Sequence, residues 1–322
     1  MNFIRKRIIT TIVAFFVATN LDFILPRLVP GNAAEIFASS TKLPGAAVLL
    51  IEQRFGLNQP ITIQYADYLR NVFGTWPPFF GFSFEFYPED VSYLIGVRIG
   101  WTILLIASSF VLSLLISYLM TTIAARRRGG KFEFSSVYSS IALTSTPPFW
   151  IAMILIWIFA VTLGWFPLFG TIDFNPGTGF DYYASVIRHA VLPILTLTIV
   201  IFGQNFLILR GASQEVLKSD YVSAAKARGL KEGRIAREYI VRNSLLPLIS
   251  LLGYSISTLI SAVVLIEVVF GYTGLGDLIV DAIINRDYPV LEGSFFYLTL
   301  VVVIGALIGD FLLLKMDPRL RK

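Results

Sequence analysis

Residues 220–247 read DYVSAAKARGLKEGRIAREYIVRNSLLP and lie between two apolar segments, about 190–209 and 246–270. Together with Lys218 just upstream, this polar stretch carries seven Lys or Arg side chains. An apolar run of roughly 20 residues is long enough to cross a bilayer as a helix. The two flanking segments are therefore predicted to be membrane spans, and the stretch between them is predicted to be a basic loop on one side of the membrane.

The composition of the whole chain agrees with a membrane protein. Of its 322 residues 56% are hydrophobic and only 15% are charged, and the mean hydropathy is +0.73. Soluble domains are roughly 45–50% apolar, so a soluble fold of this length could not cover so much apolar surface. The predicted fold class is an all-α integral membrane protein.

Six apolar segments qualify as spans. They cover about 8–29, 95–125, 137–165, 190–209, 246–270 and 295–314. Pro147-Pro148 is expected to break the third span, because proline removes a backbone donor and clashes with the preceding turn. The predicted division is an N-terminal transmembrane helix (1–29), an extracytoplasmic domain (30–94) and a five-helix core (95–322) that contains a cytoplasmic loop at 210–245.

The distribution of positive charge predicts which side each segment faces. With six spans, one side of the membrane receives residues 1–7, 126–136, 210–242 and 315–322, which hold 19 of the 26 Lys and Arg residues. Positive residues gather on the cytoplasmic side. Both termini are therefore predicted to be cytoplasmic and the 30–94 region external. The net charge of +5 follows from this sidedness, and no nucleic-acid partner is expected.

The sequence offers little for catalysis. It has no cysteine, and its one histidine, His189, has no metal-ligand pattern around it and is interpreted as an interfacial residue. Gly129-Gly130-Lys131 lacks the upstream glycine and the Ser/Thr of a phosphate-binding loop. We therefore expect no catalytic residue, no metal and no cofactor in this chain, and no nucleotide hydrolysis by it.

Two acidic residues fall inside predicted spans. Glu267 lies near the external end of the fifth span, and Asp310 lies in the sixth, little more than one turn from Lys315. Charges in the membrane usually face protein or water and can mark ion pathways. Structural pairing and ion coupling both remain possible readings. Gly305 and Gly309 form a G-x-x-x-G pattern, which is typical of close helix contact.

The basic loop is predicted to fold as two helices joined by a turn. Asp220 can cap the first helix (221–228), and Gly229 suits the left-handed conformation that ends a helix. A second basic helix is expected over about 231–242. Small residues on the first helix would allow a protein partner to approach closely. Binding to anionic lipid explains the basic charge equally well.

At these residues the chain resembles the permease subunits of binding-protein-dependent ABC importers, in the dipeptide/oligopeptide/nickel branch whose subunit has the larger external domain. Residues 224–229, AAKARG, with Leu246-Pro247 downstream, are similar to that branch's "EAA" loop. The chain departs from the general consensus in having Ser223 in place of Glu and in a longer interval to Pro247. Further similar stretches follow in order along the chain: 28–32, 55–60, Gln64-Tyr65, Tyr68-Leu69, 267–270, 274–276, 286–289, Asp310 and 317–319.

The resemblance implies a role in ATP-driven import of oligopeptides or oligosaccharides across the cytoplasmic membrane. It implies two cytoplasmic ABC ATPase subunits that bind ATP and Mg, a second homologous permease, an extracytoplasmic substrate-binding protein and surrounding lipid. The loop helix would be the coupling helix that docks on an ATPase. Its residues would include Asp220, Tyr221, Ala224, Ala225, Lys226, Arg228 and Gly229. The aromatic, Pro-rich insert at 76–88 suits either sugar stacking or packing of the external domain.

Polar residues inside predicted spans are candidates for the translocation path. They are Thr144, Ser145 and Thr146 beside the proline break, and Gln204 and Asn205 in the fourth span. Opened backbone within a membrane tends to line protein or water rather than lipid. Two other classes of function stay open: a secondary transporter coupled to ions through Glu267 and Asp310, and a membrane anchor for a signalling assembly.

Overall fold

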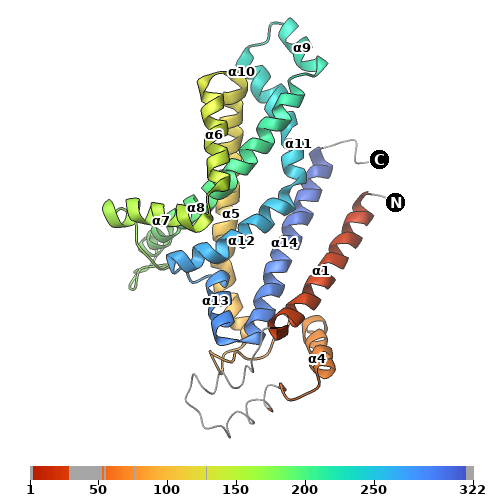
Figure 1. The fold of residues 1–322 in the computed structure, drawn as a ribbon, viewed down its shortest axis with the longest axis vertical. Helices are drawn as coiled ribbons and strands as arrows, with labels where there is room; N and C mark the ends of the chain where they lie inside the picture. The colour runs from red at the N-terminus through yellow and green to blue at the C-terminus, as the bar shows by residue number, and fades with distance from the viewer. Residues whose placement is uncertain (1–2, 29–52, 54–55, 76, 128, 317–322) are drawn as a thin grey trace. The chain divides into compact units, whose positions relative to one another are not determined.

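The computed structural model describes residues 3–28, 53, 56–75, 77–127 and 129–316 (Figure 1). Within these ranges the chain is helical, and its one β-type pairing is an isolated bridge between Phe82 and Asp90. The described residues form two compact units: those within 3–102 and 273–301, and those within 103–272 and 302–316. Helices α5 (Val91–Arg126) and α14 (Tyr288–Met316) contribute residues to both units.

The first unit contains α1 (Phe3–Leu28), α4 (Ile61–Gly74) and α13 (Leu275–Asn285), with the beginnings of α5 and α14. The Phe23 ring on α1 packs against Tyr65 and Tyr68 of α4, at 5.2 Å between ring centroids in both cases. Arg27 pairs with the buried Glu292 at the start of α14. Aromatic packing and this ion pair thus hold α1 and α4 to α14.

A buried carboxylate organises the turn between α13 and α14. Asp287 accepts hydrogen bonds from the Ser83 hydroxyl and from the backbone N–H groups of Phe84, Glu85 and Val290. Burial raises the pKa of Asp287 above its ordinary value, while the bonds from Ser83 and the backbone amides act in the opposite direction. Asp287 therefore ties the 83–85 loop to the start of α14.

The second unit is built on a long helix, α8 (Phe180–Val216). The helices that pack against it include α6 (Lys131–Ser145), α7 (Pro148–Leu155), α11 (Arg242–Ser250) and α12 (Leu252–Phe270). A π-helical segment, η1 (Ile156–Thr162), continues α7. The axis bends by 105° between α6 and the α7–η1 helix, at Pro147-Pro148, as the sequence predicts.

Serines on α5 allow it to lie close to α8. Ser109, Ser113 and Ser117 recur every fourth residue, and all three are fully buried. Their side chains bond to α8: Ser109 and Ser117 donate to backbone carbonyls, and Ser113 accepts from Asn205 at 2.9 Å. Small hydroxyl side chains at helix contacts permit close approach and supply hydrogen bonds that lipid cannot.

Glycines on α14 allow it to lie close to α12. A Cβ placed on Gly305 would lie 2.3 Å from Cδ1 of Ile256, and one placed on Gly309 would lie 2.7 Å from Cβ of Leu252. The predicted close contact along the G-x-x-x-G pattern is thereby confirmed. In the same seam Gly253 faces Ala306.

Five described helices are long and apolar enough to cross a membrane, or six if the bent α6–α7–η1 pair counts as one span. This confirms the all-α membrane fold. Two helices extend beyond the predicted spans: α8 (Phe180–Val216) includes the predicted span 190–209 and continues past both of its ends, and α14 begins at Tyr288, before the predicted start at 295. The segment between the fifth and sixth predicted spans contains α13. Helices continue past the apolar windows because their backbone hydrogen bonds do not depend on apolar side chains.

Several predictions concern residues outside the described ranges. They include residues 30–52 of the predicted extracytoplasmic domain, Phe55, Trp76 and residues 317–319.

Candidate functional site

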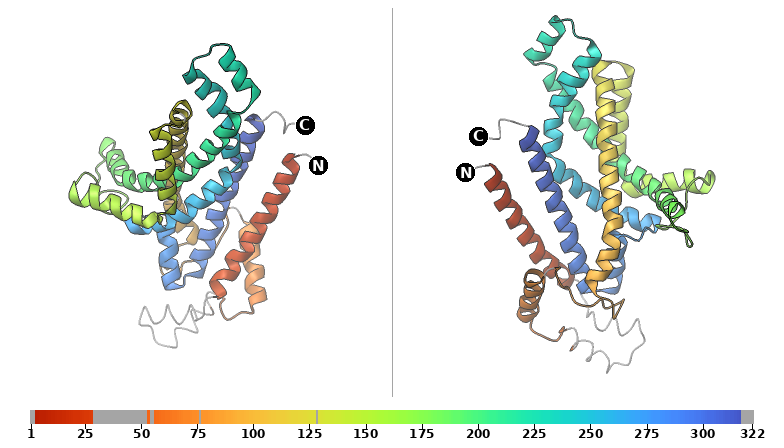
Figure 2. Two further views of the ribbon diagram at one scale, coloured as in Figure 1. Left: turned by 45° about the horizontal axis from the view of Figure 1, so that its top comes forward. Right: turned by 180° about the vertical axis from the view of Figure 1, so that it is seen from behind.

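Helix α9 (Asp220–Ala227) stands at one end of the second unit, where the chain leaves α8 and before it returns through α10 (Glu232–Arg234), η2 (Ile235–Val241) and α11. Figure 1 and both views in Figure 2 show α9 beyond the end of α6. The helix–turn–helix predicted for this loop is present. We call residues 217–241 the α9 loop.

Two side chains on one face of α9 anchor it. Val222 is 1% exposed and Ala225 is 3% exposed, and both pack in an apolar cluster with Ile235, Ile240 and Val241 of the returning chain. Tyr118 and Ala125 of α5 pack against the same cluster. The end of α5 therefore serves as the platform for the α9 loop.

The end of α9 explains its glycine. Gly229 has φ +73°, and its N–H donates to the Lys226 carbonyl at 2.9 Å. The next N–H, of Leu230, reaches back to the Ala225 carbonyl at 3.3 Å, and Leu230 packs on the buried cluster. These two bonds and the apolar contact form a Schellman motif, which requires the left-handed conformation at Gly229. The predicted role of Gly229 in ending the helix is confirmed.

The start of α9 differs from the prediction. Ser219 is the N-cap residue, with extended φ and ψ of −77° and 147°, and Asp220 is the first helical residue. The Ser219 hydroxyl bonds back to the Val216 carbonyl, so no side chain caps the helix through a hydrogen bond. The cap assignment to Asp220 was wrong because the chain turns one residue earlier. Its carboxylate still lies in the first turn, where negative charge is favoured by the helix dipole.

The face of α9 opposite the anchor is open. Tyr221 is 43% exposed, and Ala224, Lys226 and Arg228 are also exposed. The helix thus exposes one aromatic ring, small residues and two cations, while its other face is packed against the buried apolar cluster. Of the predicted coupling-helix residues, only Ala225 is buried, and it belongs to the anchor.

An exposed ion-pair cluster lies on the returning chain. Glu238 accepts from Arg234 at 2.8 Å and from Arg237 at 3.0 Å. The hydrogen bonds from Arg234 and then Arg237 lower the pKa of Glu238. Exposed pairs of this kind contribute little to stability, and salt screens them.

Sequence reasoning missed Glu133, which has the most hydrogen-bonded carboxylate near the α9 loop. Its side chain is 7% exposed, and it accepts bonds from the Gly129 N–H, Arg210 and Gln214. Its position three residues after Gly130, the N-cap of α6, is the place from which a Glu commonly reaches back to backbone donors. That spacing could have drawn attention to Glu133.

The path candidates fall into two groups. The hydroxyls of Thr144, Ser145 and Thr146 are bonded to carbonyls of their own helix, at 2.8–2.9 Å, beside the bend. Gln204 is half-buried, whereas Asn205 is fully buried and its amide donates to Ser113. Within the described residues the Asn205 Oδ1 atom has no hydrogen-bond partner. A path-lining role for these five residues stays a prediction.

The remaining ionisable residues named from the sequence lie inside the protein. Glu267 on α12 is fully buried, and Asp310 on α14 is half-buried. His189 is also buried in the protein, with Nδ1 2.9 Å from the Ser185 carbonyl, and its position at the membrane interface stays a prediction. Among the described residues no group of three or more His, Cys, Asp or Glu side chains could hold a metal ion.

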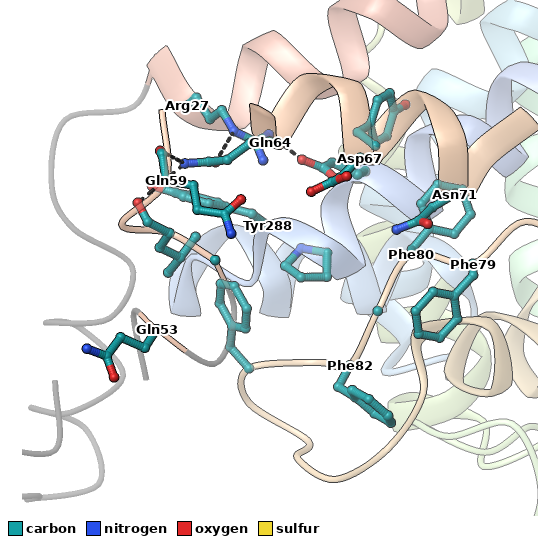
Figure 3. Close-up of a pocket in the computed structure, with 17 residues that line it drawn as sticks. Arg27, Gln53, Gln59, Gln64, Asp67, Asn71, Phe79, Phe80, Phe82 and Tyr288 are labelled. Carbon is teal, nitrogen blue, oxygen red and sulfur yellow. Dashed lines mark hydrogen bonds and ion pairs between the residues drawn. The ribbon is translucent and has the colours of Figure 1, made fainter. Parts of the chain in front are cut away.

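The first unit contains a pocket of about 440 Å³ (Figure 3). Gln64 and Asp67 of α4 line it with Tyr288, while Phe79 and Phe82 form an aromatic edge. Gln64 donates to the Gln59 carbonyl at 2.9 Å, which fixes one wall. Part of the 76–88 aromatic insert thus borders a cavity that also has polar walls.

Comparison with known proteins identifies the family. Residues 117–322 match the family described as "Binding-protein-dependent transport system inner membrane component", and residues 1–105 match its N-terminal counterpart. A di/tripeptide transport system permease protein of Pseudomonas aeruginosa is 30% identical over 348 aligned positions, covering 100% of this chain and 99% of that protein. An oligopeptide transport system permease protein of Bacillus subtilis is 33% identical over 319 positions, covering 99% of this chain and 98% of that protein.

The two family models together cover residues 1–105 and 117–322 of a fold made of membrane-spanning helices. Almost the whole chain is therefore assigned to this family. The chain belongs to the family of inner membrane components of binding-protein-dependent transport systems.

Proposed function

We propose that this chain is the transmembrane subunit of an ATP-driven importer for oligopeptides and that α9 is its docking element for a cytoplasmic ATPase subunit. The observation that carries the substrate class is the full-length similarity to two permeases whose names specify peptides. The observation that supports docking is the shape of α9: an anchored back and an exposed face of small residues, one aromatic ring and two cations.

The proposed mechanism needs no chemistry in this chain. The partner ATPases bind and hydrolyse ATP with Mg, and their closure moves α9. A conformational change can be driven only by contacts that differ in free energy between two states. In this proposal Tyr221 and Ala224 make such contacts with the ATPase, because both lie on the exposed face and neither contributes to the buried anchor.

The proposal includes a topology. We infer six spans, with the bent α6–α7–η1 pair counted as one, both termini in the cytoplasm and the 30–94 region outside. The concentration of Lys and Arg in the segments at one side supports this arrangement. A second, homologous permease and an extracytoplasmic binding protein complete the proposed assembly.

Affinity purification from native membranes in mild detergent tests the assembly. We expect ATPase subunits, a second permease and a binding protein to co-purify, and the binding protein to select peptides over oligosaccharides. Recovery of this chain alone, with transport that needs no ATP, would refute the proposal in favour of ion coupling through Glu267 and Asp310. A binding protein selective for oligosaccharides would refute the substrate class only.

A surface variant tests the docking face. Ala224→Glu places a long acidic side chain on the exposed face of α9 without touching Val222 or Ala225, so recovery of the ATPase should fall. Ser135→Glu, at an exposed position near the start of α6 and within the predicted cytoplasmic segment 126–136, is the matched control and should leave ATPase recovery unchanged. Equal ATPase recovery with both variants would remove α9 as the docking element.

A further inference from the structure

The buried Glu133 carboxylate joins two cytoplasmic-loop segments that are far apart in the sequence. One oxygen, Oε2, accepts the Gly129 N–H at 2.8 Å in the turn between α5 and α6. The other, Oε1, faces Arg210 on α8, at 3.0 Å from Nε and 2.9 Å from Nη2, and accepts from Gln214 at 3.1 Å. A carboxylate offers about four acceptor sites, and this one accepts from three residues through both of its oxygens.

The residues on α8 lie close to α9 in the chain. Arg210 and Gln214 are one turn apart on the last turns of α8, which ends at Val216. The N–H groups of Leu217 and Ser219 continue the backbone bonding, to the Ser213 and Val216 carbonyls at 3.0 Å each. The connection from α8 to α9 is therefore hydrogen-bonded throughout, and a displacement of α9 acts directly on the segment that Glu133 holds.

The returning arm of the α9 loop rests on the same hairpin. A Cβ on Gly233 would lie 3.4 Å from Cζ of Arg126, so the guanidinium at the end of α5 covers the turn of α10. Ala125, one residue earlier, packs on the cluster that anchors α9. Both arms of the loop thus meet the α5–α6 hairpin, one through Glu133 and the other through α5.

We infer that Glu133 and Arg210 are positioning residues that transmit the movement of α9 to the α5–α6 hairpin and α8 together. This inference rests on the proposed function, because it assigns how the docking element is linked to the spans. With the ion pair intact, the α8 end and the α5–α6 turn move as one piece. Without it, the last turns of α8 can shift against the turn, and part of the displacement of α9 is lost before it reaches the spans.

The experiment measures transport per ATP hydrolysed by the complete transporter, reconstituted with its ATPases, second permease and binding protein. Glu133→Gln keeps the side-chain size and removes the charge. The transport per ATP hydrolysed, which we call the coupling ratio, is expected to fall by about 2- to 30-fold, the range typical of residues that modulate coupling between sites. Basal ATP hydrolysis and recovery of the complex should be retained. The double variant Glu133→Gln/Arg210→Gln should be no worse than either single variant, because two residues that act as a pair are not additive.

A matched control is available on the same loop. Glu238→Gln neutralises an acid that also bonds two arginines, but that cluster is exposed. Its coupling ratio should stay at the wild-type value. Equal ratios for wild type and Glu133→Gln, or equal losses for Glu133→Gln and Glu238→Gln, would overturn the inference.

The outcomes separate the inference from the proposed function. If the wild-type complex neither assembles nor hydrolyses ATP, the proposed function fails. If the wild type couples and Glu133→Gln couples equally well, only the role of Glu133 fails. If Glu133→Gln reduces complex recovery, the transport per ATP hydrolysed is measured instead for Arg210→Lys. This variant keeps the positive charge but loses the paired N–H geometry of the guanidinium. A loss of coupling in recovered Arg210→Lys complexes supports the inference, and an unchanged ratio overturns it.

Discussion

Replacing Gly229 with valine should open α9 locally. Gly229 has φ +73° in the Schellman motif, where a β-branched side chain is strained. The left-handed conformation costs an L-residue about 1–2 kcal/mol. The chain can escape this strain only by giving up the bonds from Gly229 to Lys226 and from Leu230 to Ala225, each contributing about 0.5–1.5 kcal/mol. The first route costs about 1–2 kcal/mol and the second about 1–3 kcal/mol. The end of α9 is therefore destabilised by about 1–2 kcal/mol through the cheaper route, a factor of roughly 5–30 in its opening equilibrium.

Hydrogen exchange of the detergent-purified protein, followed by mass spectrometry over the peptide that covers α9, measures this opening. Gly211→Val is the matched control: Gly211 is exposed on α8, and a Cβ there would meet no atom within 4 Å. Valine is more favourable than glycine inside a helix, so exchange in the control should be equal or slower. Equal exchange of the α9 peptide in the two variants would refute the account of Gly229.

Three further predictions concern thermal stability in detergent. Gly309→Val should destabilise the protein by about 1–3 kcal/mol through overpacking, because its Cβ would lie 2.7 Å from Cβ of Leu252; an unchanged Tm would contradict the contact. Ser113→Ala should cost about 0.6–2 kcal/mol by removing the bond from the buried Asn205 amide; a neutral effect would mean that this bond contributes nothing. Asp287→Asn should flatten the pH dependence of the Tm, because the pKa of Asp287 is raised in the folded state. The stability that protonated Asp287 contributes is fully present below pH 3.8 and is lost as the pH rises through the raised pKa. A pH dependence of the Tm equal to that of the wild type would exclude Asp287 as the source of this dependence.

Each of these variants has a control at an open position. Gly100→Val tests a helical glycine with no atom within 4 Å of its Cβ. Ser139→Ala removes an exposed hydroxyl, and Asp67→Asn neutralises an acid whose side chain is 52% exposed. We expect each control to change the Tm much less than its buried counterpart, because surface substitutions usually fall within about 0.5 kcal/mol.

Local chemistry in the sequence predicted the features that a few neighbouring residues determine. Pro147-Pro148 predicts the break between α6 and α7, Gly229 predicts the end of α9, and the spacing of Gly305 and Gly309 predicts a helix contact. In each case the residue type restricts the backbone or the approach distance directly.

Features that depend on a partner from elsewhere in the chain were not predicted. The serines facing α8 look like ordinary polar residues in an apolar run until the neighbouring helix is known. Glu133 is one acid near a cluster of arginines, and only the fold shows that Arg210, far along the chain, reaches it. The full length of α8 was not predicted for a related reason. Hydropathy indicates which part of a helix lipid surrounds, and it does not indicate where the helix begins and ends.

The bend at Pro147-Pro148 has a consequence for the surrounding lipid. Helix α6 has 15 residues, which at 1.5 Å each rise about 22 Å, less than the hydrocarbon thickness of about 30 Å. The α7–η1 helix turns away by 105°, so the bent pair reaches less far across the bilayer than a straight helix of the same length. Beside this bend the bilayer must thin or admit water, at a cost of fractions of a kcal/mol per Å of mismatch. Transport should therefore depend on acyl-chain length, and longer lipids should favour the conformation in which α6 stands most upright, because an upright short helix reaches furthest across the bilayer.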